Sequence, residues 1–161
     1  AIPAIDARVT FVPVDYVASA IVALSQTDEC LGKNYHLSNP HTSTWSDVSG
    51  WIHELGYSLS IIPYAEWEIR LQEQAVLGKN VLAPLLPFFL KRWSDHDLSF
   101  AQLAQHRATL QCKETVRNLS QLNIQCPPVD RALISTYFSF FKDRDFIKHP
   151  LHYLKESALS S

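Results

Sequence analysis

The seven histidines of this 161-residue chain are the first side chains to test for metal chemistry, and no spacing among them completes a site. His149 and His152 are three residues apart, but a proline lies between them and no third ligand is near in the sequence. His53 is followed by Glu, as in the zinc motif H-E-x-x-H, but Tyr57 stands where the second histidine should be. Because a zinc site needs three or four converging protein ligands, we predict that the chain binds no metal.

No spacing in the chain identifies a catalytic nucleophile. The run Ser94-Asp95-His96-Asp97 contains the residue types of a catalytic triad, but triad members converge from separate parts of a fold, so we expect a polar loop. Cys126 stands before two prolines and is expected to be a buried, weakly polar side chain. With Cys30 and Cys112 it makes an odd number of cysteines without C-x-x-C spacing, which indicates reduced thiols and predicts a cytoplasmic location.

The sequence also lacks the groups with which a nicotinamide-dependent reductase acts directly. Four glycines are present (Gly32, Gly50, Gly56 and Gly78), and none has the spacing of a G-x-G-x-x-G turn or a P-loop. Short-chain reductases protonate a carbonyl oxygen with a tyrosine that has a lysine four positions later. The tyrosines here, none of which has that lysine, are Tyr16, Tyr35, Tyr57, Tyr64, Tyr137 and Tyr153. We therefore expect no catalytic and no cofactor-binding residue in this chain.

The composition is that of a globular protein of about one domain. Apolar residues make up 47% of the chain, which supplies a core, and 14 basic residues nearly balance 16 acidic ones. That balance argues against a nucleic-acid-binding protein. No apolar run reaches the ~20 residues of a membrane helix, so we predict no membrane span. The chain begins at Ala1 and contains no methionine, from which we expect it to be a piece of a longer protein.

Hydropathy periodicity in the first half predicts short strands that alternate with helices. The predicted strands are residues 9–12, 34–38 and 58–63. The predicted helices are residues 15–24 with Asp15 as N-cap, 45–55 after a capping box of Thr44 and Asp47 and before a Gly56 C-cap, and 65–77.

The second half is predicted to be helical. The apolar segment 81–93 contains two prolines and should form two short helices or one kinked helix. Further helices are expected over 99–110 with Ser99 as cap, 112–122, and 131–141 with Asp130 as cap. Lys91 and Arg92 form a small basic spot, expected to be a solvated helix end, with contact to an acidic partner helix as the alternative.

Together these elements predict an α+β fold that is predominantly helical with about three short strands. We expect a single subdomain over 1–161, with β-α units in 1–77, a helical part in 78–149 and a tail in 150–161. Three short strands cannot form a doubly wound sheet that is covered on both faces. We therefore expect them to border a larger sheet whose main part is absent from this chain.

Three stretches, which appear in order and cover almost the whole chain, resemble the C-terminal part of thioester reductase domains. They are residues 11–21 (FVPVDYVASAI), residues 33–40 with Trp45, Gly56-Tyr57 and 63–67, and residues 124–130 with 136–138 and Phe146. Such domains are extended short-chain dehydrogenase/reductase modules at the end of nonribosomal peptide and polyketide synthetases. They are related to carboxylic acid and aminoadipate reductases.

The resemblance implies NAD(P)H-dependent reduction of an acyl or peptidyl chain that a carrier protein presents as a phosphopantetheine thioester, with release of an aldehyde or alcohol. The family binds NADPH, and carries its catalytic Thr, Tyr and Lys, in an upstream dinucleotide-binding domain. This chain would then be the substrate-binding portion, inactive alone. Val14, Asp15 and Tyr16 match the segment beneath the cofactor and substrate cleft and are the candidate substrate-binding residues, with helix capping and packing as the alternative. Residues 78–149 would form the lid, with 81–93 as a channel wall.

Two other functions stay open at this point. The chain could be a non-catalytic binding or scaffold domain that kept the reductase C-terminal fold. It could also belong to a different extended reductase that acts on a small sugar or alcohol, although small substrates need no such long helical part.

Overall fold

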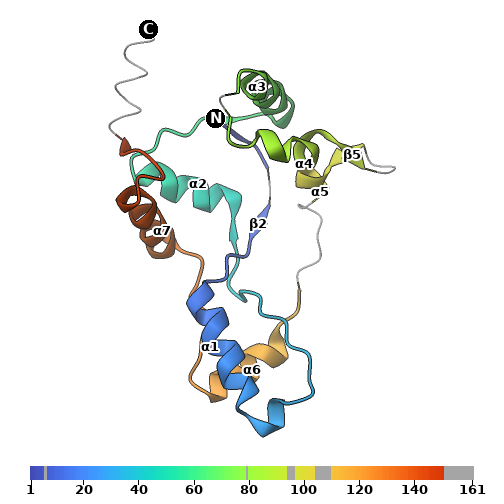
Figure 1. Ribbon diagram of the computed structural model, residues 1–161, viewed down its shortest axis with the longest axis vertical. Coiled ribbons are helices and arrows are strands. Elements are labelled where there is room, and N and C mark those ends of the chain that lie inside the picture. The colour runs from blue at the N-terminus through green and yellow to red at the C-terminus, as the bar shows by residue number, and fades with distance from the viewer. Residues whose placement is uncertain (6, 79, 94–96, 104–109, 151–161) are drawn as a thin grey trace. The chain divides into compact units, whose positions relative to one another are not determined.

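The computed structural model of the chain describes residues 1–5, 7–78, 80–93, 97–103 and 110–150 (Figure 1). Helices dominate this part of the chain, and its strands are two residues long. The prediction of a mainly helical α+β fold with few short strands is thereby confirmed. No helix among the described residues is long and apolar enough to cross a membrane.

The α-helices are α1 (Val14–Ser25), α2 (Trp45–Glu54), α3 (Tyr64–Val76), α4 (Leu86–Leu90), α5 (Phe100–Leu103), α6 (Lys113–Gln121) and α7 (Arg131–Asp143). The 3-10 helices are η1 (Asp28–Cys30) and η2 (Ala83–Leu85). The strands are β1 (Ile2–Pro3), β2 (Arg8–Val9), β3 (Ser43–Thr44), β4 (Ile61–Ile62), β5 (Arg92–Trp93) and β6 (Leu98–Ser99).

The chain divides into two compact units, each of which combines segments that are distant in the sequence. Unit 1 comprises Ala1–Ala7, Ile52–Arg107 and Lys148–Ser161, and unit 2 comprises Arg8–Trp51 and Ala108–Ile147. The predicted division into 1–77, 78–149 and 150–161 follows the order of the chain instead. Of the predicted tail, residues 151–161 lie outside the described part.

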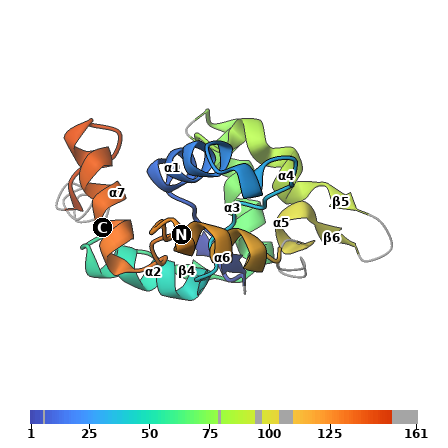
Figure 2. The same cartoon turned by 90° about the horizontal axis from the view of Figure 1, so that it is seen from below.

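Unit 1 is built around the inner face of α3. Trp67 and Leu71, one turn apart on α3, are buried, and Phe89 of α4 meets the Trp67 ring edge-on at a centroid distance of 5.1 Å. Strands β1 and β4 are parallel, and β5 and β6 form an antiparallel hairpin. Figures 1 and 2 show this hairpin beside α4 and α5. The predicted break in 81–93 is real, since η2 and α4 replace one continuous helix.

A polar cluster joins α3 to the β5–β6 hairpin. Glu68, on the inner face of α3, accepts a hydrogen bond from Arg92 Nη2 at 2.6 Å, and Arg92 Nη1 donates to Gln102 Oε1 at 2.9 Å. The Tyr64 hydroxyl lies 2.7 Å from Ser99 Oγ. Of the predicted basic spot, Lys91 is exposed at the C-cap of α4, as expected of a solvated helix end, whereas Arg92 belongs to a strand and an ion pair, so the expectation is wrong for Arg92.

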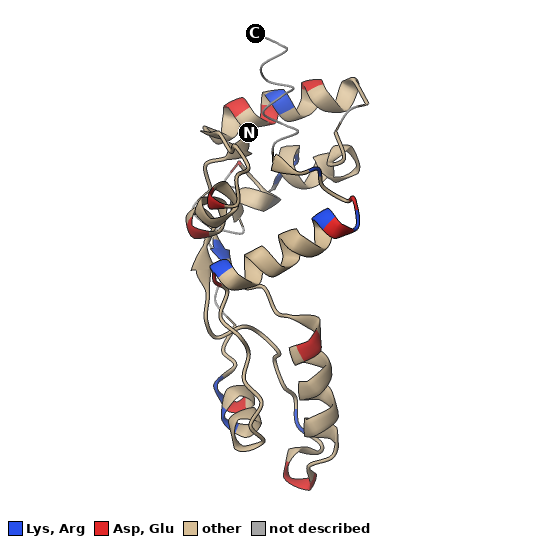
Figure 3. Cartoon of the chain, turned by 90° about the vertical axis from the view of Figure 1, so that its left-hand side faces the viewer, with Lys and Arg blue, Asp and Glu red and all other residues tan. Residues whose placement is uncertain are grey.

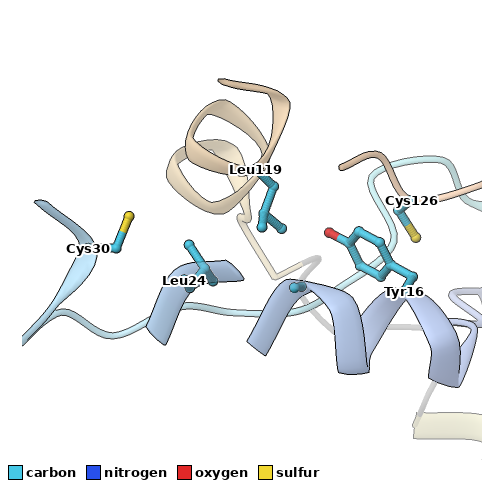
Figure 4. Packing of buried hydrophobic residues seen from close by; sticks show 6 residues of the cluster. Tyr16, Leu24, Cys30, Leu119 and Cys126 are labelled. Carbon is cyan, nitrogen blue, oxygen red and sulfur yellow. The ribbon is translucent and has the colours of Figure 1, made fainter. Parts of the chain in front are cut away.

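Unit 2 has a small apolar core between α1 and α6 (Figure 4). It consists of Tyr16, Ala20, Leu24, Cys30, Leu119 and Cys126. The three α1 residues are spaced i, i+4 and i+8, so they share one helix face, and Leu119 of α6 is only 1% exposed. All three cysteines are buried free thiols, as expected for Cys126 in particular.

Three helix starts follow the predicted capping chemistry. At α2, the backbone N–H of Thr44 donates to Asp47 Oδ2 at 2.8 Å, and the N–H of Asp47 donates to Thr44 Oγ1 at 3.1 Å, which completes the capping box. At α5, Ser99 exchanges the same two kinds of bond with Gln102. At α7, Asp130 Oδ1 accepts from the N–H of Leu133 at 2.9 Å.

The start of α1 differs from its prediction. Pro13, with φ −61° and ψ 138°, is the N-cap, and its carbonyl accepts from the N–H of Val17 at 3.1 Å. Asp15 lies within the first turn, and its Oδ1 accepts from the neighbouring Tyr16 N–H at 2.9 Å. The predicted N-cap role of Asp15 is therefore wrong, because the extended proline already ends the preceding segment and Val14 is helical.

The predicted strands are shorter than expected or absent among the described residues. Strand β2 ends at Val9, which pairs with Ser43, the first residue of its antiparallel partner β3. Residues 58–63 contribute only β4. Residues 34–38 form no ladder, although Tyr35 and Leu37 do alternate inward against the unit 2 core. The period-2 pattern there reflects one-sided burial without a partner strand.

Candidate functional site

The candidate residues Val14, Asp15 and Tyr16 open helix α1 and point in different directions. Tyr16 is 6% exposed, whereas Val14 is 82% exposed and Asp15 is also exposed. Successive residues of an α-helix are separated by about 100°, so three consecutive side chains cannot face one cavity. The structure thus assigns Tyr16 to the interior of unit 2, and Val14 and Asp15 to its surface.

Tyr16 borders a pocket of about 250 Å³ within unit 2. The other lining residues are Pro40, His41, Val116, Ser120, Ile124, Gln125 and Cys126. They come from three segments, which are the turn after Asn39, the helix α6 and the loop that precedes α7. Figure 4 shows the Tyr16 ring between Leu119 of α6 and Cys126 of that loop.

Asn39 positions the turn that lines this pocket. Its side chain is buried, and Nδ2 donates to the carbonyl oxygens of Phe11 at 2.8 Å and Pro127 at 2.9 Å. Its Oδ1 accepts from the backbone N–H of His41 at 2.9 Å. One amide therefore ties the segment before α1, the segment before α7 and the turn itself together. The sequence analysis assigned no such role to Asn39.

A second pocket of about 500 Å³ adjoins the first, since Pro40 and Val116 line both. Its remaining lining residues are Asn39, Leu110, Gln111, Cys112, Lys113 and Arg117. Two cations on α6 therefore stand beside a largely apolar wall. Arg117 Nη2 is 4.0 Å from Glu114 Oε1 in an exposed pair, which leaves the guanidinium available to an anion in solution.

Burial sets the protonation of the groups around Tyr16. It is the main cause that raises the Tyr16 pKa, with smaller contributions from the thiols of Cys126 and Cys112. Burial also raises the Cys126 pKa, assisted by Cys112 and Asp15. Both groups are therefore neutral near pH 7. Tyr16 can donate a hydrogen bond to a ligand, and Cys126 is not an activated nucleophile.

The other predicted features do not line either pocket or lie outside the described residues. Neither pocket uses a residue of the predicted channel wall 81–93, in which Val81 and Phe88 are exposed. The run 94–97 lies outside the described residues except for Asp97, as does His152. Among the residues that the structure does describe, no group of three or more His, Cys, Asp or Glu side chains could hold a metal ion.

The glycines do not form a dinucleotide cradle. Gly32, Gly56 and Gly78 adopt positive φ, and they follow the C-terminal ends of η1, α2 and α3. A pyrophosphate binds where a glycine-rich turn opens a helix at its N-terminus. These glycines therefore do not fit the pyrophosphate of a nicotinamide dinucleotide.

Comparison with known proteins identifies the relatives of this chain. No protein-family model matches it. A linear gramicidin synthase polypeptide of Brevibacillus parabrevis is 27% identical over 142 residues, which are 86% of this chain and 3% of that protein. The isonitrile lipopeptide synthase of Streptomyces coeruleorubidus is 32% identical over 139 residues, 84% of this chain and 9% of that protein. The chain thus spans less than a tenth of either relative.

Two solved structures share the fold. The terminal R domain from the myxalamid PKS-NRPS biosynthetic pathway is 34% identical, with a TM-score of 0.76 over 92% of this chain and 36% of that one. A thiolation-reductase di-domain from an archaeal non-ribosomal peptide synthetase is 18% identical, with a TM-score of 0.59 over 91% of this chain and 31% of that one. The chain is a homologue of the terminal reductase regions of nonribosomal peptide and polyketide synthetases, and it corresponds to the C-terminal part of such a thioester reductase domain.

Proposed function

We propose that this chain forms the substrate- and carrier-binding portion of an NAD(P)H-dependent thioester reductase. The observation that carries the proposal is the 34% identity with a terminal R domain over 92% of the chain. The curated relatives support it, since they include synthetases and an aldehyde reductase, lnbA of Aspergillus flavus, which is 31% identical over 83 residues.

In the proposed reaction, an acyl or peptidyl thioester on the phosphopantetheine arm of a carrier protein receives a hydride at its carbonyl carbon and a proton at its oxygen. The resulting hemithioacetal loses the pantetheine thiol as the C–S bond breaks, which releases an aldehyde. A second reduction would give the alcohol. The hydride donor, NADPH in this proposal, binds outside these residues, because their glycines do not form a cradle for it.

The role of this chain is to hold the arm and its cargo. The two adjoining pockets of unit 2 offer apolar walls from Pro40, Leu110 and Val116, with Lys113 and Arg117 beside the larger one. An apolar lining suits an acyl chain, and cations suit the phosphodiester that joins the arm to its carrier. Tyr16, which is neutral and borders the smaller pocket, supplies a hydrogen-bond donor for an amide or thioester oxygen of the arm.

Val14 and Asp15 remain proposed substrate contacts of a different kind. Both are exposed on unit 2. They can therefore contact a substrate only if it binds between α1 and another part of the enzyme. We also propose a reducing, cytoplasmic setting, which is supported by three cysteines that are all free thiols.

The proposal is tested with the complete polypeptide that contains this chain. We expect it to oxidise NADPH and form an aldehyde from an acyl chain loaded on a phosphopantetheinylated carrier protein, and we expect the 161-residue chain alone to do neither. Aldehyde formation by the 161 residues alone would overturn their proposed inactivity. A complete polypeptide that binds the loaded carrier but reduces nothing would instead indicate the scaffold function.

Tyr16→Phe tests the site itself, because it removes one hydroxyl and keeps the ring in the core. Loss of one hydrogen bond costs about 0.5–1.5 kcal/mol, so KM for the loaded carrier should rise roughly two- to tenfold with little change in kcat. Tyr35→Phe is the matched control, since the Tyr35 hydroxyl accepts from Asn118 Nδ2 at 3.0 Å and lines neither pocket. Equal KM values for both variants would remove Tyr16 from the site.

A further inference from the structure

Helix α1 presents an apolar surface to solvent. Val14, Ala18, Ile21 and Val22 are exposed and are spaced i, i+4, i+7 and i+8, so they form one stripe, which we name the outer face of α1. Val14 is 82%, Ile21 55% and Val22 54% exposed. Phe11, just before the helix, is exposed as well. The stripe lies on the side of the helix away from the unit 2 core.

The opposite side of α1 is apolar too. Tyr16, Ala20 and Leu24 are buried there against α6 and the loop before α7. Among the twelve residues of α1 only Asp15 is charged. In Figure 3, α1 accordingly shows a single red band, whereas α6 beside it shows both colours. A helix with apolar residues on two opposite sides and few polar ones between them is typical of the inside of a larger core.

The part of the homologous reductase domain that lies outside this chain is the candidate to cover the outer face of α1. The chain corresponds to 36% of the solved terminal R domain chain, so about two thirds of that domain lies outside the match. That remainder is the part to which the proposed function assigns the dinucleotide. It is also part of one folded domain, and such permanent contacts bury more apolar surface than transient ones.

The carrier protein is a poorer occupant of the outer face. It must dock and leave in each reaction cycle, and the outer face offers no cation to an acidic partner, since its exposed polar neighbours on α1 are Asp15, Ser19 and Ser25. The cations of unit 2 that adjoin a pocket are instead Lys113 and Arg117 on α6. Apolar and cationic surfaces are therefore on different helices of one unit.

We propose that the outer face of α1 is the surface on which the dinucleotide-binding part of the reductase domain packs permanently. The proposal rests on the proposed function, because that function supplies the missing part. It assigns Ala18, Ile21 and Val22 to an interface within the domain, and leaves Val14, at the start of the stripe, to the substrate contact proposed above. It also makes unit 2, through α1, the point at which this chain joins the catalytic part.

Thiol labelling of the complete encoded polypeptide tests the proposal. Ile21→Cys introduces a thiol on the outer face with little change in volume. Gln74→Cys introduces one on the exposed polar side of α3 as the matched control. With a maleimide under native conditions, we expect the thiol at position 21 to react roughly tenfold or more slowly than that at position 74, as for a site that opens only briefly. In the 161-residue chain, the two should react at similar rates.

Three results would overturn the proposal. The first is equal labelling of both positions in the complete polypeptide. The second is protection of position 21 that disappears on dilution, which would assign the outer face to a second copy. The third is a complete polypeptide with no residues beyond these 161. None of the three depends on reductase activity or carrier binding, so the proposed function is judged separately.

Discussion

Helices α1 and α3 begin in the same way and differ in what they show to solvent. Each follows an extended proline, Pro13 or Pro63, that caps the helix without a side-chain hydrogen bond. Each carries an acidic residue in its first turn, and their lengths are 12 and 13 residues. Yet most exposed residues of α3 are polar, namely Glu66, Arg70, Gln72, Glu73 and Gln74 beside Ile69 and Val76, whereas α1 exposes the apolar stripe of Val14, Ala18, Ile21 and Val22 beside Asp15, Ser19 and Ser25.

The difference shows that the buried side of a helix determines how it packs in its own unit. The exposed side indicates whether water or another part of the protein covers it. Both helices bury apolar side chains, Trp67 and Leu71 in one and Tyr16 and Leu24 in the other. The charged outer side of α3 is that of a helix built to face water. The apolar outer side of α1 is that of a helix built to be covered, which is why we assign a partner to α1 and none to α3.

The largest effect is expected where α1 and α6 bury each other. Leu119→Ala should lower the free energy of unfolding by about 2–5 kcal/mol, because a fully buried leucine leaves a cavity. Ile21→Ala, on the outer face of α1, should cost less than about 1 kcal/mol in the 161-residue chain. Urea unfolding of both variants measures the contrast. Similar losses would mean that the outer face is packed within this chain.

The next prediction compares two ion pairs of α3, one on its buried side and one on its exposed side. Arg92→Ala leaves the largely buried Glu68 carboxylate without its cation, and Glu68 Oε1 already has no partner. We expect a loss of about 1–3 kcal/mol, kept low because the Arg92 side chain is 38% exposed. Arg70→Ala breaks a bond of the same length, 2.6 Å to Glu66, on the exposed side.

That control should change the free energy of unfolding by less than about 0.5 kcal/mol, because exposed ion pairs contribute little. Both variants can be compared by urea unfolding at the same ionic strength. If Arg70→Ala proved as destabilising as Arg92→Ala, burial would not be what distinguishes the two faces of α3.

A smaller effect is expected at α2, which has the side-chain cap that α1 and α3 lack. Thr44→Ala should destabilise by about 1 kcal/mol, because it removes the acceptor for the Asp47 N–H. Hydrogen bonds from Thr44 hold the Asp47 pKa below its ordinary value. The contribution of Asp47 is therefore complete above its unfolded pKa of about 3.9 and is lost as the pH falls through the lower, folded pKa.

Asp47→Asn should accordingly be less stable than the parent chain at pH 7, and the difference should shrink as the pH falls below about 4. Thermal unfolding across this pH range measures it. A difference that stays constant with pH would show that the Asp47 charge contributes nothing at this helix start.

The smallest effect on stability is expected from Ile21→Gln. This variant tests the difference between the exposed sides of α1 and α3 most specifically. In the 161-residue chain it should change the free energy of unfolding by less than about 0.5 kcal/mol, as exposed substitutions do. It should also reduce the weak self-association that an uncovered apolar face predicts. Sedimentation velocity over a concentration series measures this, with Gln74→Leu as the reverse change on α3. A parent chain that stays monomeric at high concentration would contradict the prediction.

The sequence predicted much of this fold because local chemistry determines the helices. The capping residues Thr44 and Asp130 and the 3.6-residue period place α2 and α7 close to where they are, and Ser99 marks the start of α5, while residues 104–109 of the helix predicted over 99–110 lie outside the described residues. The strands were overpredicted because alternation reports burial on one side, as at Tyr35 and Leu37, and not the presence of a partner strand. At α1 the proline outweighed Asp15, since it fixes an extended conformation before the first helical residue.

The site could be predicted only in part. The matched motif led to Tyr16, which does border a pocket, but a motif cannot show that Val14 and Asp15 point away from it. The role of Asn39 depends on carbonyl groups 28 and 88 residues away, so no local pattern reveals it. The outer face of α1 was readable from the sequence in principle, because a helix with one charged residue in twelve is not an ordinary surface helix.

The central claim is that this chain binds the loaded carrier protein, and amide NMR of the 161 residues tests it most directly. The chain would be titrated with a carrier protein that holds an acyl-phosphopantetheine arm, with the same carrier lacking its arm as the control. We predict arm-dependent shifts at Tyr16, in the turn after Asn39 and in α6, where the two pockets lie. Shifts confined to other regions, or no shifts at millimolar carrier, would contradict the account.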